Sequence, residues 1–149
     1  MASPRPRAIK EARGFQHAGD EYYYRPLVVG DKLFTYVAHV RAGGDMAPSE
    51  EEAKLFELSL FMLDGELEAT LSGERVRLRV GDALHIPLNA PFGVRNTTDR
   101  SASFVLTFTP PPALGGIDEM FDRARQKGRR VFEPSEFDGI VGETRFPFR

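Results

Sequence analysis

The stretch from Leu58 to Asn96 constrains the fold most, because turn dipeptides divide it into short segments. Apolar residues alternate with other residues within these segments, at positions 58, 60 and 62 and again at 67, 69 and 71. A period of two is typical of a β-strand with one buried face. The stretch therefore predicts three short antiparallel strands joined as a meander, with tight turns at Asp64-Gly65 and Ser72-Gly73, and a fourth strand that opens at Gly81-Asp82.

The residues that follow Gly81 have the spacing of a known motif. Gly81 is followed by Pro87 after five intervening residues, and then by Phe92 and Asn96. This resembles the second motif of the cupins, G-x5-P-x-G-x2-H-x3-N, and residues 63–66 resemble the end of their first motif, G-x5-H-x-H-x3-4-E-x6-G. The resemblance covers about residues 27 to 110. It implies an all-β fold, an antiparallel jelly-roll β-barrel with the ligand site inside.

The metal ligands of the family are missing from this alignment. In metal-dependent cupins, two His and a Glu of the first motif and a His of the second bind one divalent metal. Here Phe92 stands at the second-motif His position, Leu58 stands at the Glu position, and the two other His positions fall within residues 51–54. A phenyl ring and an isobutyl group offer no lone pair. The resemblance therefore implies a cupin with no bound metal or other cofactor.

A second alignment, counted forward from Gly44, keeps a metal site open. It places Glu50, Glu52 and Glu57 at three of the metal-binding positions. Three carboxylates suit a hard cation such as calcium or manganese, so this alternative predicts a metal-dependent oxygenase or lyase. The same acidic residues also fit a solvated loop, because runs of like charge usually face water.

Three residues are candidates for proton transfer. His39 and His85 lie on predicted strands, and an imidazole with its ordinary pKa of about 6.5 suits acid/base chemistry at neutral pH. Glu57 is the third candidate. The resemblance implies that such pairs can work without metal, as in some cupin-fold isomerases and epimerases. A histidine on a strand is also commonly a packed, hydrogen-bonded residue, so an enzyme and a binding protein both stay open.

The same reasoning predicts an apolar pocket inside the barrel. Leu58 and Phe92 are included because the family's metal ligands point inward at those two positions. Alternation along the strands predicted at 33–41 and 104–109 adds further residues on the inner face. The protein is thus predicted to bind or transform a small, partly apolar molecule, with the ligand contacted by Tyr36, Leu58, Leu60, Phe92 and Phe104.

The predicted organisation is an N-terminal arm at 1–25, the barrel at 26–110, and a helix with a tail at 111–149. The first 20 residues lack periodicity and are expected to be irregular. A helix is predicted from Ile117 to about Gly128, with Met120, Phe121 and Ala124 on the face that lies against the barrel. Further apolar residues in the tail, expected to cover the barrel or a neighbouring subunit, are Phe132, Phe137 and Phe146.

Composition excludes several classes of protein. With 149 residues and no cysteine, the chain can bury one core but has no disulfide and no thiolate chemistry. The net charge of −2 argues against nucleic-acid binding, and the basic residues within 123–130 are interpreted as a solvated helix face.

The location and assembly of the chain are also expected from the sequence. No secretion signal is visible and no apolar run reaches the ~18 residues that span a bilayer, so a cytoplasmic protein that does not bind membranes is expected. Spare apolar side chains at 22–29 and around Phe132 and Phe137 predict a homodimer.

Overall fold

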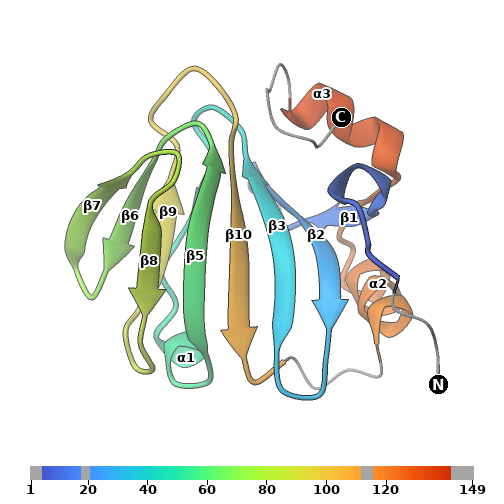
Figure 1. Ribbon diagram of the computed structural model, residues 1–149, viewed down its shortest axis with the longest axis horizontal. Coiled ribbons are helices and arrows are strands. Elements are labelled where there is room, and N and C mark those ends of the chain that lie inside the picture. Colours follow the sequence, from blue (N-terminus) through green and yellow to red (C-terminus); the bar gives the residue numbers. More distant parts are fainter. Residues whose placement is uncertain (1–4, 18–20, 112–115, 142–149) are drawn as a thin grey trace.

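The computed structural model describes residues 5–17, 21–111 and 116–141. In this part of the chain, antiparallel strands form two sheets that enclose a common core (Figure 1). Sheet A has the order β11-β1-β2-β3-β10-β5-β8, with the bounds Gly14–Gln16 (β1), Tyr22–Val29 (β2), Phe34–Val40 (β3), Glu57–Asp64 (β5), Ala83–Ile86 (β8), Ala102–Thr109 (β10) and Val131–Phe132 (β11). Sheet B has the order β4-β9-β6-β7, with the bounds Asp45–Met46 (β4), Leu67–Leu71 (β6), Glu74–Leu78 (β7) and Phe92–Arg95 (β9).

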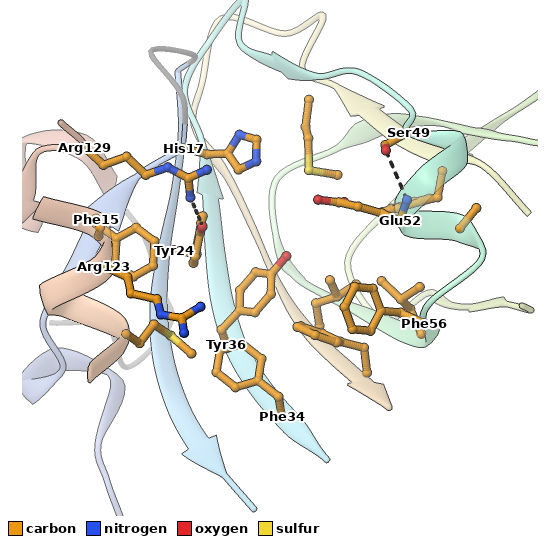
Figure 2. Close-up of a pocket in the computed structure, with 18 of the residues that line it drawn as sticks. Phe15, His17, Tyr24, Phe34, Tyr36, Ser49, Glu52, Phe56, Arg123 and Arg129 are labelled. Carbon is orange, nitrogen blue, oxygen red and sulfur yellow. Dashed lines mark hydrogen bonds between the residues drawn. The ribbon is translucent and has the colours of Figure 1, made fainter. Parts of the chain in front are cut away.

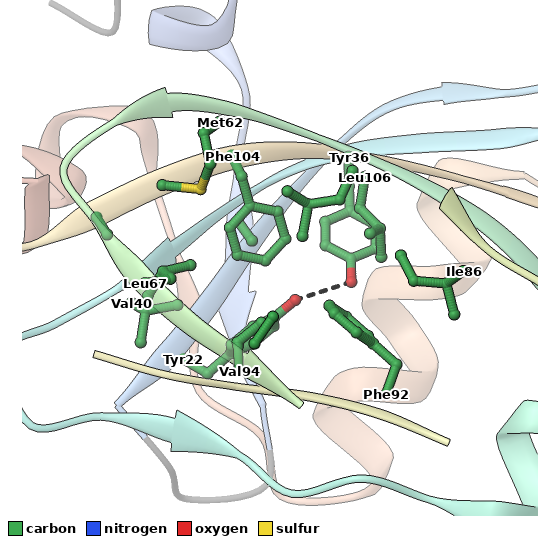
Figure 3. Close-up of a cluster of buried hydrophobic side chains, with 14 of the residues drawn as sticks. Tyr22, Tyr36, Val40, Met62, Leu67, Ile86, Phe92, Val94, Phe104 and Leu106 are labelled. Atoms are coloured by element: carbon green, nitrogen blue, oxygen red, sulfur yellow. Dashed lines mark hydrogen bonds between the residues drawn. The ribbon is translucent and has the colours of Figure 1, made fainter. Parts of the chain in front are cut away.

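The core lies between the two sheets, as Figure 3 shows. Alternate residues of β3 point into it, and the predicted inner face of this strand is confirmed. Residues from β5 and β10 meet residues of sheet B there, because every second side chain of a strand lies on the same face. One polar pair is buried in this core, where the hydroxyl groups of Tyr22 and Tyr36 are 2.9 Å apart.

The turn after β5 joins the two sheets. β5 pairs with β10 and β8, whereas β6 pairs with β7 and β9. The predicted meander is therefore wrong at Asp64-Gly65, although the hairpin at Ser72-Gly73 forms as predicted. Gly65 has φ +74°, and a Cβ atom there would lie 2.9 Å from the Cα of Ala102. A side chain is excluded from this corner by both backbone conformation and space.

The antiparallel, mainly β fold expected from the sequence is confirmed, with a few helices added to it. The closed jelly-roll barrel is confirmed only in part. No strand of sheet A pairs with a strand of sheet B among the described residues, so the two sheets pack face to face without closing into one barrel.

Both chain ends contribute more structure than the sequence predicted. β1 lies within the segment expected to be irregular, and it pairs with β2 and β11. The 3-10 helices η1 (Ile9–Glu11) and η2 (Pro134–Phe137) and the short helix α3 (Asp138–Val141) accompany it. Phe146 lies outside the described residues.

The tail covers the outer face of sheet A, which is the face turned away from sheet B. A second apolar cluster, here called the outer cluster, forms between them from Tyr23, Val37, Leu63, Phe132, Phe137, Ile140 and Val141. The tail therefore covers its own chain. Tyr22, Tyr23, Phe132 and Phe137 are all buried, so they are not the spare surface on which the homodimer was predicted.

Helix α2 (Ile117–Gln126) confirms the predicted C-terminal helix. Its buried residues are Met120, Phe121 and Ala124, and the ring of Phe121 lies 5.5 Å from that of Phe15 in β1. Gly128, with φ +74°, turns the chain after the helix. None of the helices within the described ranges has the length and apolar composition required to cross a bilayer.

Candidate functional site

A cavity of about 290 Å³ opens at one end of the space between the sheets (Figure 2). Strands β2, β3, β5 and β10 of sheet A form its floor, and Phe92 of β9 closes it from sheet B. The short helix α1 (Glu50–Ala53) borders one side and α2 borders the opposite side. The volume is at the small end of the range for small-molecule pockets, so the cavity suits a compact ligand.

Aromatic rings form most of the apolar wall. The ring of Phe108 contacts those of Phe34 and Phe56 at centroid distances of 4.9 and 5.0 Å. Tyr36 joins the same group, 5.6 Å from Phe34. Tilted and edge-on arrangements of this kind hold the rings in fixed positions. The wall can therefore bind a flat, apolar body in a defined orientation.

Glu52 is the acidic side chain of the cavity, and among the described residues no other carboxylate lines it. It projects from α1, and Ser49 caps the start of this helix, because its hydroxyl accepts a hydrogen bond from the backbone N–H of Glu52 at 3.2 Å. Its charge lies close enough to the phenols of Tyr24 and Tyr36 to raise their pKa values. The carboxylate thus shares the cavity with two hydroxyl groups.

These phenols are protonated at neutral pH. Burial is the main cause that raises the pKa of Tyr24 to about 12, against the opposing effect of Arg129. Burial also raises the pKa values of Tyr36 and of its partner Tyr22. Arg129 donates a hydrogen bond from Nη1 to the Tyr24 hydroxyl at 2.8 Å, so the Tyr24 proton is free to point elsewhere. Tyr24 and Tyr36 are therefore protonated hydroxyl groups and not bases, and in the contact between Tyr36 and Tyr22 either hydroxyl can be the donor.

A basic edge lies opposite Glu52. Arg123, Lys127 and Arg129 all line the cavity, and the labelled guanidinium groups of Arg123 and Arg129 extend into it from the α2 side (Figure 2). The expectation that the basic residues of 123–130 form a solvated face is wrong for Arg129, which is half-buried. Arg123 and Lys127 are exposed while they border the cavity, and Arg123 forms an ion pair with Glu119 at 3.8 Å. Arg125 and Arg130 are exposed as expected and form ion pairs with Asp122 and Glu136.

The predicted ligand-binding residues divide into two groups. Tyr36, Leu58 and Phe92 line the cavity. Leu60 and Phe104 do not; both are fully buried in the core between the sheets. They share the inner face of sheet A with the lining residues but lie farther along their strands, where sheet B covers them.

His39 lies on the outer face of β3, away from the cavity. It is fully buried, its Nδ1 lies 2.7 Å from the Ser103 hydroxyl, and its ring packs 5.7 Å from that of Phe137. Burial, with a smaller contribution from Arg25, lowers the pKa of His39 to about 3. A neutral imidazole sealed beneath the tail has no path to a ligand in the cavity.

His85 and Glu57 do lie together, but on the surface. Nε2 of His85 is 2.6 Å from Oε2 of Glu57, and the two side chains are 64% and 57% exposed. Neither residue lines the cavity. The structure thus brings these two predicted catalytic residues into contact with each other and keeps them apart from the predicted pocket.

The cavity does not fit the metal of the cupin family. Leu58 and Phe92 contribute only hydrocarbon to it, and Glu52 and His17 are its candidate donors. The alternative carboxylate set is dispersed, because Glu50 is exposed on α1 while Glu57 is bound to His85. Within the described ranges, no group of three or more His, Cys, Asp or Glu side chains is placed to hold a metal ion.

Sequence reasoning missed Tyr24, Arg123, Lys127 and Arg129, and it considered Glu52 only as a metal ligand. A signal for the basic residues was present. Arg123 and Lys127 each follow a residue of the apolar α2 face, Met120 and Ala124, by three positions, so they border the buried face of the helix. No comparable pattern marks Tyr24 or Arg129.

Comparison with known proteins agrees with this fold. A model of the cupin domain matches residues 37–108. Polyketide synthase CurC of Streptomyces cyaneus is 30% identical over 126 residues, which are 79% of this chain and 80% of that protein.

Solved structures share the fold at lower identity. The polyketide cyclase RemF from Streptomyces resistomycificus has a TM-score of 0.65 and 15% identity, over 98% of this chain and 91% of RemF. KdgF from Halomonas sp. has a TM-score of 0.60 and 18% identity, over 66% and 87% of the two chains. Taken with the two motifs and the paired antiparallel sheets, these matches show that the chain belongs to the cupin superfamily.

Proposed function

We propose that this cupin binds a small, partly apolar carbonyl compound in the cavity and converts it by acid/base chemistry without a metal. The observation that carries the proposal is the placement of Glu52 opposite the hydroxyl groups of Tyr24 and Tyr36, within a cavity walled by aromatic rings. The names of two relatives suggest which type of reaction to propose. CurC is called a polyketide synthase and RemF a polyketide cyclase, so we propose ring closure of a polycarbonyl chain.

The residues of the cavity suit such a reaction. A CH₂ group between two carbonyls is acidic enough for a carboxylate to remove its proton, and Glu52 takes this role. The enolate oxygen gains negative charge, which the O–H groups of Tyr24 and Tyr36 stabilise. The enolate carbon then forms a bond to another carbonyl carbon of the same chain, and that carbonyl oxygen takes the proton back from Glu52. The new carbon–carbon bond closes the ring. Glu52 then removes the second proton of the former CH₂ carbon, and the new hydroxyl leaves as water with that proton, which gives a conjugated ring with no net oxidation or reduction.

The aromatic wall has a separate role. A flexible chain must bring two distant carbons within about 3 to 3.5 Å before a bond can form between them. Phe34, Phe56 and Phe108 present a fixed surface on which the chain can fold. Phe92 covers the same space from the side of sheet B.

The test uses a synthetic linear 1,3,5-tricarbonyl compound with an aryl end group, whose cyclisation is followed by absorbance and product NMR. We expect Glu52→Gln to slow turnover by about 100-fold or more while ligand binding persists. Glu51→Gln is the matched control, because Glu51 belongs to the same helix and is exposed like Glu52 but does not line the cavity. Unchanged turnover in Glu52→Gln would contradict the proposal.

Two further outcomes distinguish the rival functions. Turnover that is lost with a chelator and restored by added metal would favour the metal-dependent oxygenase or lyase. Binding of the compound by the wild type without any conversion would identify a binding protein instead.

We also propose that two chains pair in solution. β8 is an edge strand among those described, and Phe61, beside it on β5, is 45% exposed. Covering such an edge by two-fold pairing removes a site of aggregation. Light scattering at micromolar concentration should give a dimer mass, and a monomer mass would contradict the pairing.

A further inference from the structure

The fixed charge of the cavity is unbalanced. Arg123, Lys127 and Arg129 line it from the α2 side, against one carboxylate, that of Glu52, among the described residues that line it. Outside the cavity, Arg123 also pairs with the exposed Glu119 at 3.8 Å. The chain as a whole carries a net charge of −2. Basic side chains are thus gathered at the cavity of an acidic protein, and Arg129, which is half-buried, is screened less by solvent than the exposed Arg123 and Lys127.

The backbone places these side chains specifically. Arg123 and Lys127 are four residues apart, so they lie on the same side of α2. Gly128 then reverses the chain, and the backbone N–H of Arg129 donates to the Ala124 carbonyl at 2.9 Å. This turn points Arg129 into the cavity, where the hydroxyl of Tyr24 holds its Nη1 atom at 2.8 Å.

A guanidinium group has five N–H donors, and only one donor position of Arg129 is used by Tyr24. Paired N–H groups of an arginine match the two oxygens of a carboxylate in a bidentate contact. The basic edge therefore offers an anion site at one end of the cavity, while Glu52 and the aromatic wall lie at the other side.

We infer that the ligand carries a carboxylate, which Arg123 and Arg129 bind and to which Lys127 adds attraction. This inference rests on the proposed function and names its substrate class: a partly apolar carbonyl compound with an acidic end. With the carboxylate held at α2, the apolar body lies along Phe34 and Phe108 and a carbon of the chain faces Glu52. The basic edge thus determines the orientation in which the ligand binds.

The test compares two probes with the same ring system, 6-hydroxy-2-naphthoate and its methyl ester, by titration calorimetry. We expect the acid to bind the wild type at least 10-fold more tightly than the ester. The double variant Arg123→Gln with Lys127→Gln should reduce this preference to less than 3-fold and leave ester binding unchanged. Retained ester binding also shows that the variant is folded.

Arg125→Gln is the matched control, because Arg125 belongs to the same helix but pairs with Asp122 outside the cavity. It should keep the wild-type preference. A loss of preference as large in Arg125→Gln as in the double variant would overturn the assignment to the cavity-lining residues. Equal binding of acid and ester by the wild type would overturn the inference and leave the acid/base proposal standing. Failure of both probes to bind would overturn the inference together with ligand binding in the cavity.

Discussion

Strand β3 has two different environments on its two faces. On the inner face, Phe34 and Tyr36 border a hollow that also holds a carboxylate and several basic groups. On the outer face, Val37 and His39 lie under the tail, where the ring of Phe137 fills the space. The chain thus leaves space on one face of the sheet and closes the other. We expect substitutions on the outer face to cost stability and those at the cavity to change ligand binding.

The largest expected effect is that of Phe137→Ala. The guanidinium carbon of the buried Arg25 lies 4.3 Å from the centre of the Phe137 ring, and the ring of Phe132 lies 5.6 Å away. Removing this ring should lower the free energy of unfolding by about 3 to 5 kcal/mol, measured by urea denaturation. Phe56→Ala, at the half-buried rim of the cavity, is the comparison and should cost less than half as much. Equal losses would contradict the difference between the two faces.

His39 gives the outer face a pH dependence. Its pKa is lowered to about 3 in the folded chain, whereas an unfolded histidine has a pKa of about 6.5. Between these values the unfolded state binds one more proton than the folded state. Stability from this residue is therefore present above about pH 6.5 and falls by about 1.4 kcal/mol per pH unit as the pH drops towards 3.

The measurement is the free energy of unfolding of the wild type and of His39→Gln, obtained by urea denaturation at several pH values from 4 to 7. The variant should lose this part of the pH dependence. His85→Gln serves as its control, because His85 is exposed. If the free energy of unfolding changes with pH in the same way in both variants and in the wild type, His39 is not the group responsible.

Alternation along the strands predicted which residues face inward but not how far the space between them is filled. Leu58 and Leu60 share one face of β5, yet only Leu58 reaches the cavity and Leu60 is fully buried in the core. A period of two specifies a face and contains no information on position along the strand. The same limit applies to Phe104, whose neighbour on that face, Leu106, lines the cavity instead.

The sequence did not predict the contacts between segments that are distant in the chain. The basic residues near α2 were expected only to be solvated. Their spacing from Met120 and Ala124 places Arg123 and Lys127 beside the buried face of the helix, but it does not show that this face borders a cavity. His39 looked like a catalyst because the tail that buries it begins more than 90 residues later in the chain. Asp64-Gly65 looked like a hairpin because a tight turn has the same residues whether its strands pair or enter different sheets.

Phe92→Trp should have an intermediate effect that is specific to the cavity. Phe92 is buried and lines the cavity from sheet B, so a larger ring there reduces the space for a ligand. We expect weaker ligand binding, with an overpacking cost of about 1 to 3 kcal/mol in the free energy of unfolding. Titration of the naphthoate ester tests the first part and urea denaturation the second. Unchanged ester affinity would show that the ligand does not reach this wall.

The smallest effect is expected at Glu57 and His85, which lie neither at the cavity nor under the tail. Their side chains form a short contact of 2.6 Å but are both more than half exposed. Because exposed ion pairs contribute little, Glu57→Gln should change the free energy of unfolding by less than about 1 kcal/mol. Turnover of the tricarbonyl compound should equal that of the wild type, since Glu57 does not line the cavity. A loss of turnover above 10-fold with stability unchanged would instead place the reaction on the outer surface of β5 and β8, because the 2.6 Å contact would then be the acid/base pair.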